Sequence, residues 1–250
     1  MFSLCIPTMN RYDNFLSTYL PKYIDNELID EIVITDETGE DVEKIRNKYG
    51  GCSKLKLHVN PTTYGPFLNK YKCCRLAKNK WIALIDPDNF ADKEYFLCAK
   101  EFMKDRGLEN ATNAILAPSF ARPKFDYRHL SGQVFRKGAM NQIKDHDANM
   151  RDHASQKPYS VFLNTGNYIL NKHLVDNIDL SMEFGHLHRS SACDVLYFNT
   201  ILFEQENLHM YVVPGLFYEH GAHDESIYLT THNNTCDFVR VVSERFHVLT

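Results

Sequence analysis

The first ninety residues alternate between short apolar runs and segments whose apolar residues have helical spacing. The runs predict strands, and the segments between them predict amphipathic helices. The strands are expected at 2–6, 29–34, 55–59 and 81–85, and the helices at 14–20, 41–49 and 67–77. Asn14 or Ser17 is expected to cap the first helix, and Asp41 the second. This βαβ order predicts an α/β fold with a doubly wound, mostly parallel sheet.

The remaining residues follow a less regular pattern. Residues 122–157 are polar with little periodicity, so we expect a flap over a binding surface there. Helices are expected at 95–103, 193–204 and 236–248, and strands at 114–118, 159–163, 168–170, 210–213 and 217–223. A chain of 250 residues is long enough for one large domain or two closely packed halves.

The expected strand at 81–85 ends at two carboxylates, Asp86 and Asp88, which are separated by Pro87. Ligands of open parallel sheets bind outside the carboxyl ends of the strands. Two hard oxygen ligands on a turn stiffened by proline suit Mg²⁺ or Mn²⁺, which would also carry substrate phosphates. The alternative is an ordinary strand-to-loop turn, since Asp-Pro and Asp-Asn pairs commonly form turns.

Composition narrows the class of protein. The formal charge is -4, and there is no basic block, which argues against nucleic acid as the main partner. The 7 cysteines form no Cys-x-x-Cys pair, a pattern typical of reduced thiols in a cytoplasmic protein. No run approaches the roughly 20 apolar residues of a membrane span.

Several motifs in this order resemble the GT-A class of nucleotide-sugar-dependent glycosyltransferases, of the family 2 type. Residues 4–11 resemble the opening strand and its Pro-Thr-x-Asn-Arg loop, and residues 32–37 resemble the second strand and its acidic pair. Asn60, Gly65 and Asn69, followed by residues 77–88, resemble the third motif and the Asp-x-Asp strand. A similar compact layout without a membrane span is known among bacterial and large-virus members, which implies a cytoplasmic protein, in the host cytoplasm if viral.

The resemblance implies a GT-A, Rossmann-like fold with a mostly parallel central sheet flanked by helices and a smaller mixed acceptor-side region. Residues 1–250 would form a single domain, with a nucleotide-sugar-binding half at 1–92 and an acceptor-binding half at 93–250. The chain departs from the family pattern at Thr38-Gly39, where Gly-Ser is usual, although Gly39 can still make the turn.

The resemblance also implies roles for particular residues. Thr8, Asp36 and Asn60 would line the nucleotide pocket, and acceptance of a hydrogen bond from the base by Asp36 suits the uracil of a UDP-sugar. Asp86 would lie near the ribose and the metal, and Asp88 would bind the metal, which acts as a Lewis acid on the departing diphosphate. The donor-binding residues implied in this way are Pro7, Thr8, Arg11, Asp36, Asn60, Gly65, Asn69, Asp86, Pro87 and Asn167.

The acceptor hydroxyl, from a glycan or another molecule, must lose a proton during transfer. Residues 190–195 resemble the place where inverting members carry an acidic pair at a helix start, but only Asp194 remains because Cys193 replaces the usual Glu. Asp194 is therefore the candidate base of an inverting reaction. The alternative is that Asp194 only caps the helix.

His220 is the candidate that completes the metal shell, and an imidazole ligand favours Mn²⁺ over Mg²⁺. With 12 histidines in the chain, the alternative for any one of them is a surface side chain hydrogen-bonded to a neighbour. Contacts with the sugars are also expected from two further groups. These are Asn164, Gly166 and Asn167, and, in the flap, Tyr127, Arg128 and His129.

Two other functions compete with a transferase. One is a metal-dependent hydrolase, and its candidate residues are His186, His188, Asp194, His220 and His223. The other is a sugar-binding domain without catalysis. The hydrolase would not need the nucleotide-pocket residues Thr8, Asp36 and Asn60, so metal-dependent UDP binding separates it from the transferase.

Overall fold

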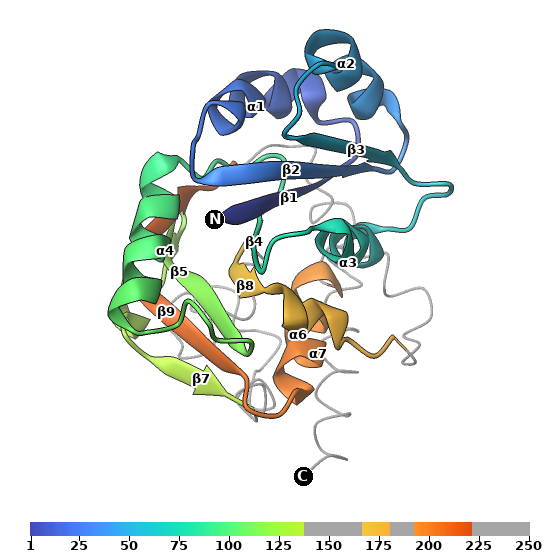
Figure 1. The fold of residues 1–250 in the computed structure, drawn as a ribbon. Coiled ribbons are helices and arrows are strands. Elements are labelled where there is room, and N and C mark those ends of the chain that lie inside the picture. The colour runs from blue at the N-terminus through green and yellow to red at the C-terminus, as the bar shows by residue number, and fades with distance from the viewer. Residues whose placement is uncertain (138–166, 181–192, 222–250) are drawn as a thin grey trace.

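The computed structural model describes residues 1–137, 167–180 and 193–221, whose strands form one nine-stranded sheet (Figure 1). The strand order is β3-β2-β1-β4-β8-β5-β9-β7, and β6 pairs with β5 off this path. The strands are β1 (Phe2–Thr8), β2 (Ile29–Asp36), β3 (Leu55–Val59), β4 (Trp81–Leu84), β5 (Ala114–Arg122), β6 (Phe125–Asp126), β7 (Val134–Arg136), β8 (Ile169–Asn171) and β9 (His209–Glu219).

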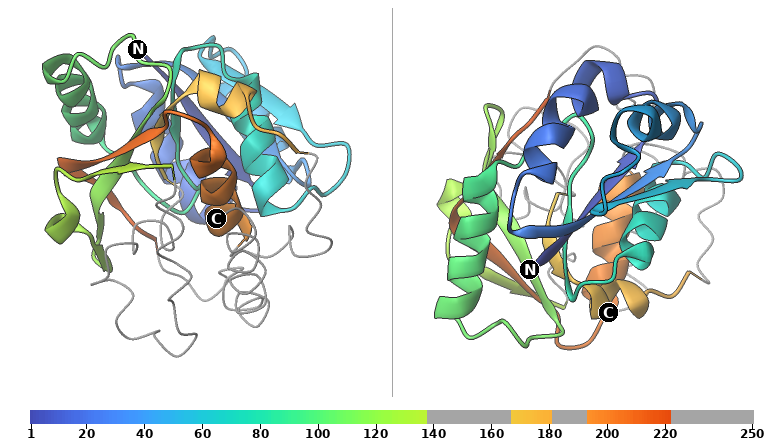
Figure 2. Two further views of the ribbon diagram at one scale, coloured as in Figure 1. Left: turned by 90° about the horizontal axis from the view of Figure 1, so that it is seen from below. Right: turned by 45° about the horizontal axis from the view of Figure 1, so that its top comes forward.

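Helices pack on both faces of the sheet. In Figure 1, α1 and α2 lie on one side of β1, β2 and β3, while α3 lies on the other, and Figure 2 shows α3 beside α7. The helices are η1 (Tyr12–Leu16), α1 (Ser17–Ile24), α2 (Glu40–Tyr49), α3 (Pro66–Leu76), α4 (Lys93–Asp105), η2 (Arg128–Leu130), α6 (Lys172–Asp176), η6 (Cys193–Tyr197) and α7 (Phe198–Glu204). The predicted alternation of strands and helices in the first half is confirmed.

The first four strands are parallel, as predicted, and their register brings their carboxyl ends to one edge. Thr8 at the end of β1 is opposite Asp36 at the end of β2, and Cys5 is opposite Leu84 of β4. The strands β1 and β4 are buried along their whole length, which explains why β4 is entirely apolar and β1 is apolar except for Ser3 and Thr8. β8 then runs antiparallel between β4 and β5, so the second half of the sheet is mixed.

The predicted flap is wrong for its first part. The segment from Phe125 to Arg136 forms β6, η2 and β7, and β7 pairs with β9 at the edge of the sheet. Tyr127, Leu130 and Phe135 are buried, so three anchors hold this segment although most of its other residues are polar. Residues 138–157 lie outside the described residues, as do the strand expected at 159–163 and the helix expected at 236–248. The two strands expected at 210–213 and 217–223 are one continuous strand, β9, up to Glu219.

The predicted helix caps are also wrong, because carboxylates from other segments replace the local ones. Asp41 lies within α2, and its carboxylate accepts hydrogen bonds from the backbone N–H groups of Arg11 and Tyr12 at the start of η1, at 2.9–3.0 Å. The N–H of Val42 near the start of α2 donates instead to Asp36 Oδ2, at 3.0 Å. A helix N-terminus needs acceptors for its free N–H groups but does not require them to be local.

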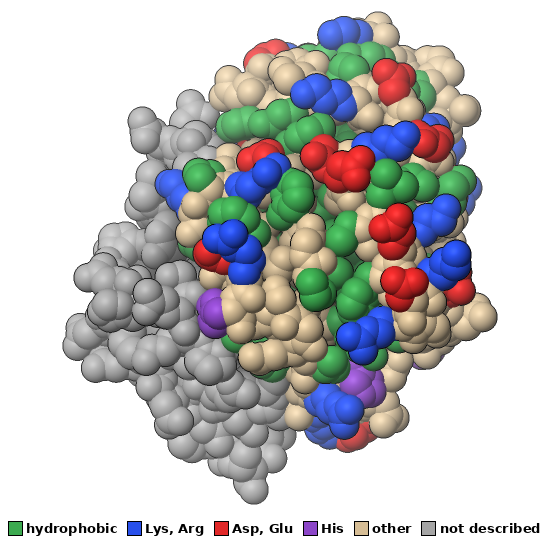
Figure 3. All heavy atoms as spheres, turned by 90° about the vertical axis from the view of Figure 1, so that its left-hand side faces the viewer, with side chains coloured by type: hydrophobic (Ala, Val, Ile, Leu, Met, Phe, Trp, Pro, Cys, Tyr) green, Lys and Arg blue, Asp and Glu red, His purple; other side chains and the backbone are tan. Residues whose placement is uncertain are grey.

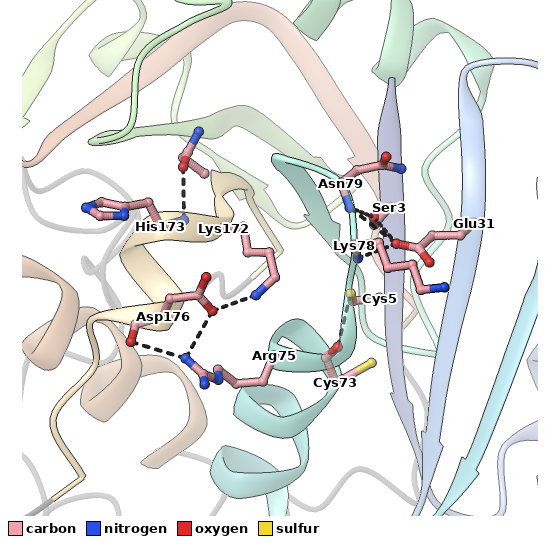
Figure 4. Close-up of polar contacts among 11 residues, drawn as sticks. Ser3, Cys5, Glu31, Cys73, Arg75, Lys78, Asn79, Lys172, His173 and Asp176 are labelled. Atoms are coloured by element: carbon pink, nitrogen blue, oxygen red, sulfur yellow. Dashed lines mark hydrogen bonds and ion pairs between the residues drawn. The ribbon is translucent and has the colours of Figure 1, made fainter.

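Glu31 fixes the entry to β4 from the opposite edge of the sheet (Figure 4). Its side chain is buried, and Oε1 accepts hydrogen bonds from the Ser3 hydroxyl and the Lys78 N–H, both at 2.5 Å. The Asn79 N–H donates to the Ser3 hydroxyl oxygen at 3.1 Å. One carboxylate therefore ties β1 and β2 to the turn from which β4 starts.

We expect Glu31→Ala to lower the free energy of unfolding by about 2 kcal/mol, because it leaves buried donors without an acceptor. Urea denaturation followed by circular dichroism measures this change. Glu101→Ala, which removes an exposed carboxylate from α4, is the control and should stay within about 0.5 kcal/mol of the parent. Equal midpoints for the two variants contradict the assigned role of Glu31.

Candidate functional site

Thr8, Asp36 and Asn60 meet at the carboxyl edge of the sheet. The Glu37 N–H donates to the Thr8 carbonyl at 3.1 Å, and the Asn60 N–H donates to the Asp36 carbonyl at 2.8 Å. Asn69, from α3, joins them: its Oδ1 accepts from Asn60 Nδ2 at 3.0 Å. The sequence motifs thus occupy one continuous wall, with Asn69 as its centre.

Most polar side-chain atoms of this wall are already engaged within the protein. Asp36 has no exposed surface, and its Oδ1 accepts from the Thr38 N–H at 3.1 Å while Oδ2 accepts from Val42. The Thr8 hydroxyl donates to Asp41 at 2.5 Å. These side chains therefore hold the loops in shape.

Three other predicted donor-binding residues border this wall. Pro7 is buried in β1, and Arg11 is partly exposed where η1 begins. Gly65 precedes α3 with φ 85°, a backbone conformation that favours glycine, and Pro66 takes the first position of the helix. The loop before Gly65 is attached to the wall because the Tyr64 N–H donates to Glu37 Oε2 at 2.6 Å.

Asp86 is held by Asn167, which reaches it from the segment before β8. The Asp86 N–H donates to Asn167 Oδ1 at 2.6 Å, and Asn167 Nδ2 donates to Asp86 Oδ2 at 3.3 Å. The same Nδ2 donates to the hydroxyl of Tyr218 on β9, also at 3.3 Å. Asn167 is buried, so it acts as a clamp that fixes both the backbone and the carboxylate of Asp86.

Lys70 connects Asp86 to Asp194. Its Nζ lies 2.8 Å from Asp86 Oδ1 and 2.7 Å from Asp194 Oδ2, and its side chain is only 3% exposed. The three residues come from α3, from the end of β4 and from η6. Lys70 was not among the residues predicted from the sequence. Helical spacing places it on the same face as buried Phe67 and Cys73, and a lysine on such a face is the signal that could have revealed it.

The charges of this triad influence one another. Burial lowers the pKa of Lys70, but the neighbouring Asp194 and Asp86 charges outweigh it and leave that pKa above its ordinary value. Burial raises the pKa of Asp194 to about 6, and the charge of Asp86 adds to this rise while Lys70 opposes it. Asp194 is 15% exposed, so a carboxylate with a pKa near neutrality borders solvent.

The Asp88 loop is fastened to the end of β9. Phe90 and Glu219 exchange two backbone hydrogen bonds, at 2.8 and 2.9 Å, and the Gly221 N–H donates to Asn89 Oδ1 at 3.1 Å. His220 lies between these two attachments, and its ring packs edge-on against Phe125 at 4.9 Å. Two segments far apart in the sequence thus bring the partly exposed Asp88 and His220 into one region.

These residues offer a small set of cation ligands. Both oxygens of Asp86 have protein partners. Asp88 and His220 are both partly exposed at the rim. Across residues 1–137, 167–180 and 193–221, no group of three or more His, Cys, Asp or Glu side chains could hold a metal ion. Carboxylate and imidazole are ligand types that Mn²⁺ accepts, and substrate phosphates and water commonly complete such shells.

The remaining predicted residues divide into two groups. Tyr127 is buried, and Arg128 pairs with its neighbour Asp126 at 2.6 Å, so only His129 of that trio is an exposed side chain without an assigned structural contact. The others lie outside the described residues: Asn164, Gly166, His186, His188 and His223. The hydrolase cluster is therefore represented here by Asp194 and His220 alone.

Comparisons with known proteins identify the fold. Neither protein-family profiles nor curated protein sequences match the chain. Among solved structures, residues 1–349 of S. aureus TarS align over 96% of this chain and 64% of that one, with a TM-score of 0.62 and 16% identity. The same protein in complex with UDP-GlcNAc aligns over 90% and 59%, with a TM-score of 0.64 and 15% identity.

The mannosyltransferase PcManGT from Pyrobaculum calidifontis, in complex with GDP-Man and Mn²⁺, aligns over 92% of this chain and 59% of that one. Its TM-score is 0.59 at 12% identity. This chain has the GT-A fold. It spans less than two thirds of the length of the structures that it matches.

Acidic and basic side chains are interspersed on the face of the GT-A domain seen in Figure 3, among scattered hydrophobic ones. In the part of the chain that the structure describes, no helix combines the length and apolarity needed to cross a membrane.

Gly221 leaves no room for a side chain, because an added Cβ would lie 2.0 Å from the Asp88 carbonyl oxygen. We expect Gly221→Ala to push the Asp88 loop away from β9 and to lower the free energy of unfolding by about 1–3 kcal/mol. Gly51→Ala is the matched control, since its Cβ would meet nothing within 4 Å. Equal melting temperatures of the two variants, measured by calorimetry, would show that the Asp88 loop is not held as described.

Proposed function

We propose that this protein is a metal-dependent glycosyltransferase that moves a sugar from a nucleotide-diphosphate sugar to a hydroxyl acceptor. The observation that carries the proposal is the Asp86–Lys70–Asp194 triad, with its buried lysine and two partly exposed carboxylates, near the rim residues Asp88 and His220 at the carboxyl edge of a GT-A sheet. Ligands of such sheets bind at this edge. UDP-GlcNAc in one structural neighbour and GDP-Man with Mn²⁺ in another support a nucleotide-sugar donor.

The donor end of the proposed site is the wall around Asn69. The diphosphate would face Asp88 and His220, which would hold Mn²⁺ or Mg²⁺, and the bound cation would stabilise the negative charge of the leaving diphosphate. The base would face Asp36 and Asn60. A hydrogen bond from uracil to Asp36, which makes a UDP-sugar the favoured donor, requires this fully buried carboxylate to become accessible and to share Oδ1 with Thr38.

The acceptor end centres on Asp194. Its partly exposed carboxylate would take the proton of the attacking hydroxyl while the nucleotide diphosphate leaves from the opposite face of the sugar, which inverts the anomeric centre. The acceptor in this proposal is a glycan or another hydroxyl compound. A cytoplasmic location, in the host cytoplasm if the source is viral, remains part of the proposal because the 7 cysteines show no disulfide pattern.

We expect Mn²⁺-dependent binding of UDP to the parent protein and its weakening by about 100-fold or more in Asp88→Asn, since a direct ligand should matter at least as much as an outer-shell partner. Isothermal titration of UDP with and without Mn²⁺ measures both affinities. Asp105→Asn, an exposed carboxylate at the end of α4, is the control. Absence of metal-dependent UDP binding in the parent rejects the transferase, and unchanged binding in Asp88→Asn rejects the ligand assignment.

We expect Asp194→Asn to lower kcat about 10²–10⁴-fold with UDP binding intact, because the amide cannot accept the proton. The reactive form of the parent is the ionised carboxylate, whose pKa is about 6, so its rate should be constant above that pH and fall about tenfold per unit below it. Donor turnover between pH 4.5 and 8 measures the profile. Full turnover by Asp194→Asn would contradict the base assignment and favour a retaining reaction.

A further inference from the structure

The buried lysine of the triad, Lys70, has no role in the reaction proposed above. The Lys70 side chain is 3% exposed, so its ammonium group is shielded from solvent and from a bound acceptor substrate. Two carboxylates from different segments compensate its charge. Lys70 is carried by α3, which packs against β1 and against η6. It therefore sits on a rigid element that contacts both the donor half of the sheet and the segment that bears Asp194.

The two carboxylates depend on Lys70 to different extents. Asp86 is held three times: by Lys70 at Oδ1, by Asn167 Nδ2 at Oδ2, and by Asn167 Oδ1 at its backbone N–H. Asp194 has Lys70 at Oδ2 and a backbone hydrogen bond with Val195 next to it in the chain. Loss of Lys70 should leave Asp86 largely in place but free the Asp194 carboxylate to rotate.

We propose that Lys70 is the positioning residue for Asp194: its ammonium, anchored on Asp86, holds the Asp194 carboxylate in the orientation that receives the acceptor proton. This inference rests on the proposed function and deepens it by adding a residue to the same site. Asp86 then serves as the fixed anchor for the Lys70 ammonium, and Asp88 and His220 would bind the divalent metal ion. The donor and acceptor ends of the site are thereby linked through one nitrogen atom.

The geometry predicts that loss of the Lys70 charge lowers kcat but leaves the affinity for UDP nearly unchanged. In Lys70→Met the side chain keeps a similar length but loses its charge, so we expect kcat to fall about 100-fold, as for a misplaced catalytic group. The affinity for UDP with Mn²⁺ should change less than about threefold, since Asn167 still holds Asp86. Lys70→Arg restores a cation and should recover at least a tenth of the parental kcat.

Lys172→Met is the matched control, because Lys172 also pairs with an aspartate, Asp176 at 2.5 Å, but on α6 outside the site (Figure 4). It should keep parental kcat and UDP affinity. Parental kcat in folded Lys70→Met overturns the proposal, as does a loss of UDP–Mn²⁺ affinity equal to the loss of kcat. If the parent itself binds no UDP with Mn²⁺, the proposed function fails, which is a separate and distinguishable result.

Lys70→Met leaves two partly buried carboxylates without their shared cation and could prevent folding. A second comparison covers that case, since Asp86→Asn and Asp86→Asn/Lys70→Met differ only in the lysine and leave a single carboxylate of the pair. We expect kcat of the double variant to be about 100-fold below that of Asp86→Asn. Equal kcat values overturn the proposal. A crystal structure of the double variant should show the Asp194 carboxylate rotated, and an unmoved carboxylate contradicts the positioning role.

Discussion

The site is organised by one buried cation that compensates two carboxylates. Lys70 could not remain charged inside the domain without a neighbouring carboxylate, because an isolated buried charge is strongly unfavourable. The requirement acts in both directions, since the two partly buried aspartates would repel each other without the lysine between them. β4, α3 and η6 must therefore dock together before all three charges are compensated.

Other buried polar side chains also join separate segments of the chain, most of them distant in the sequence. Asp41 provides acceptors for a helix that is distant in sequence, Asp36 does so for α2, and Glu31 secures the turn before β4. Asn167 completes the series from the second half of the chain. In each case a buried side chain replaces water for backbone N–H groups at the end of an element, so the loops around the site are held by hydrogen bonds instead of by apolar packing.

The sequence predicted the fold well where local patterns determine it. Apolar runs identified β1 to β4, and their polar ends identified the edge that bears Thr8, Asp36 and Asn60, because a parallel sheet aligns its carboxyl ends. It did not predict Lys70, Tyr218 or the cross-segment caps. Helical spacing marks Lys70 as a buried position, but its partners, like Tyr218 and the caps, depend on which side chains meet after folding, and hydrophobic periodicity carries no such information. The flap prediction was wrong for residues 125–136 for the same reason, since burial of Tyr127, Leu130 and Phe135 outweighs the polar residues around them.

The place of β8 in the sheet has a consequence for how the chain can fold. β4 pairs with β1 on one side and with β8 on the other, yet β8 lies nearly ninety residues further along the chain. Residues 1–92 taken alone would expose an apolar strand edge open to pairing with any other chain. The motifs proposed to bind the nucleotide and their structural support are thus separated in sequence, and a ribosome must complete most of this protein before the first half is protected from aggregation.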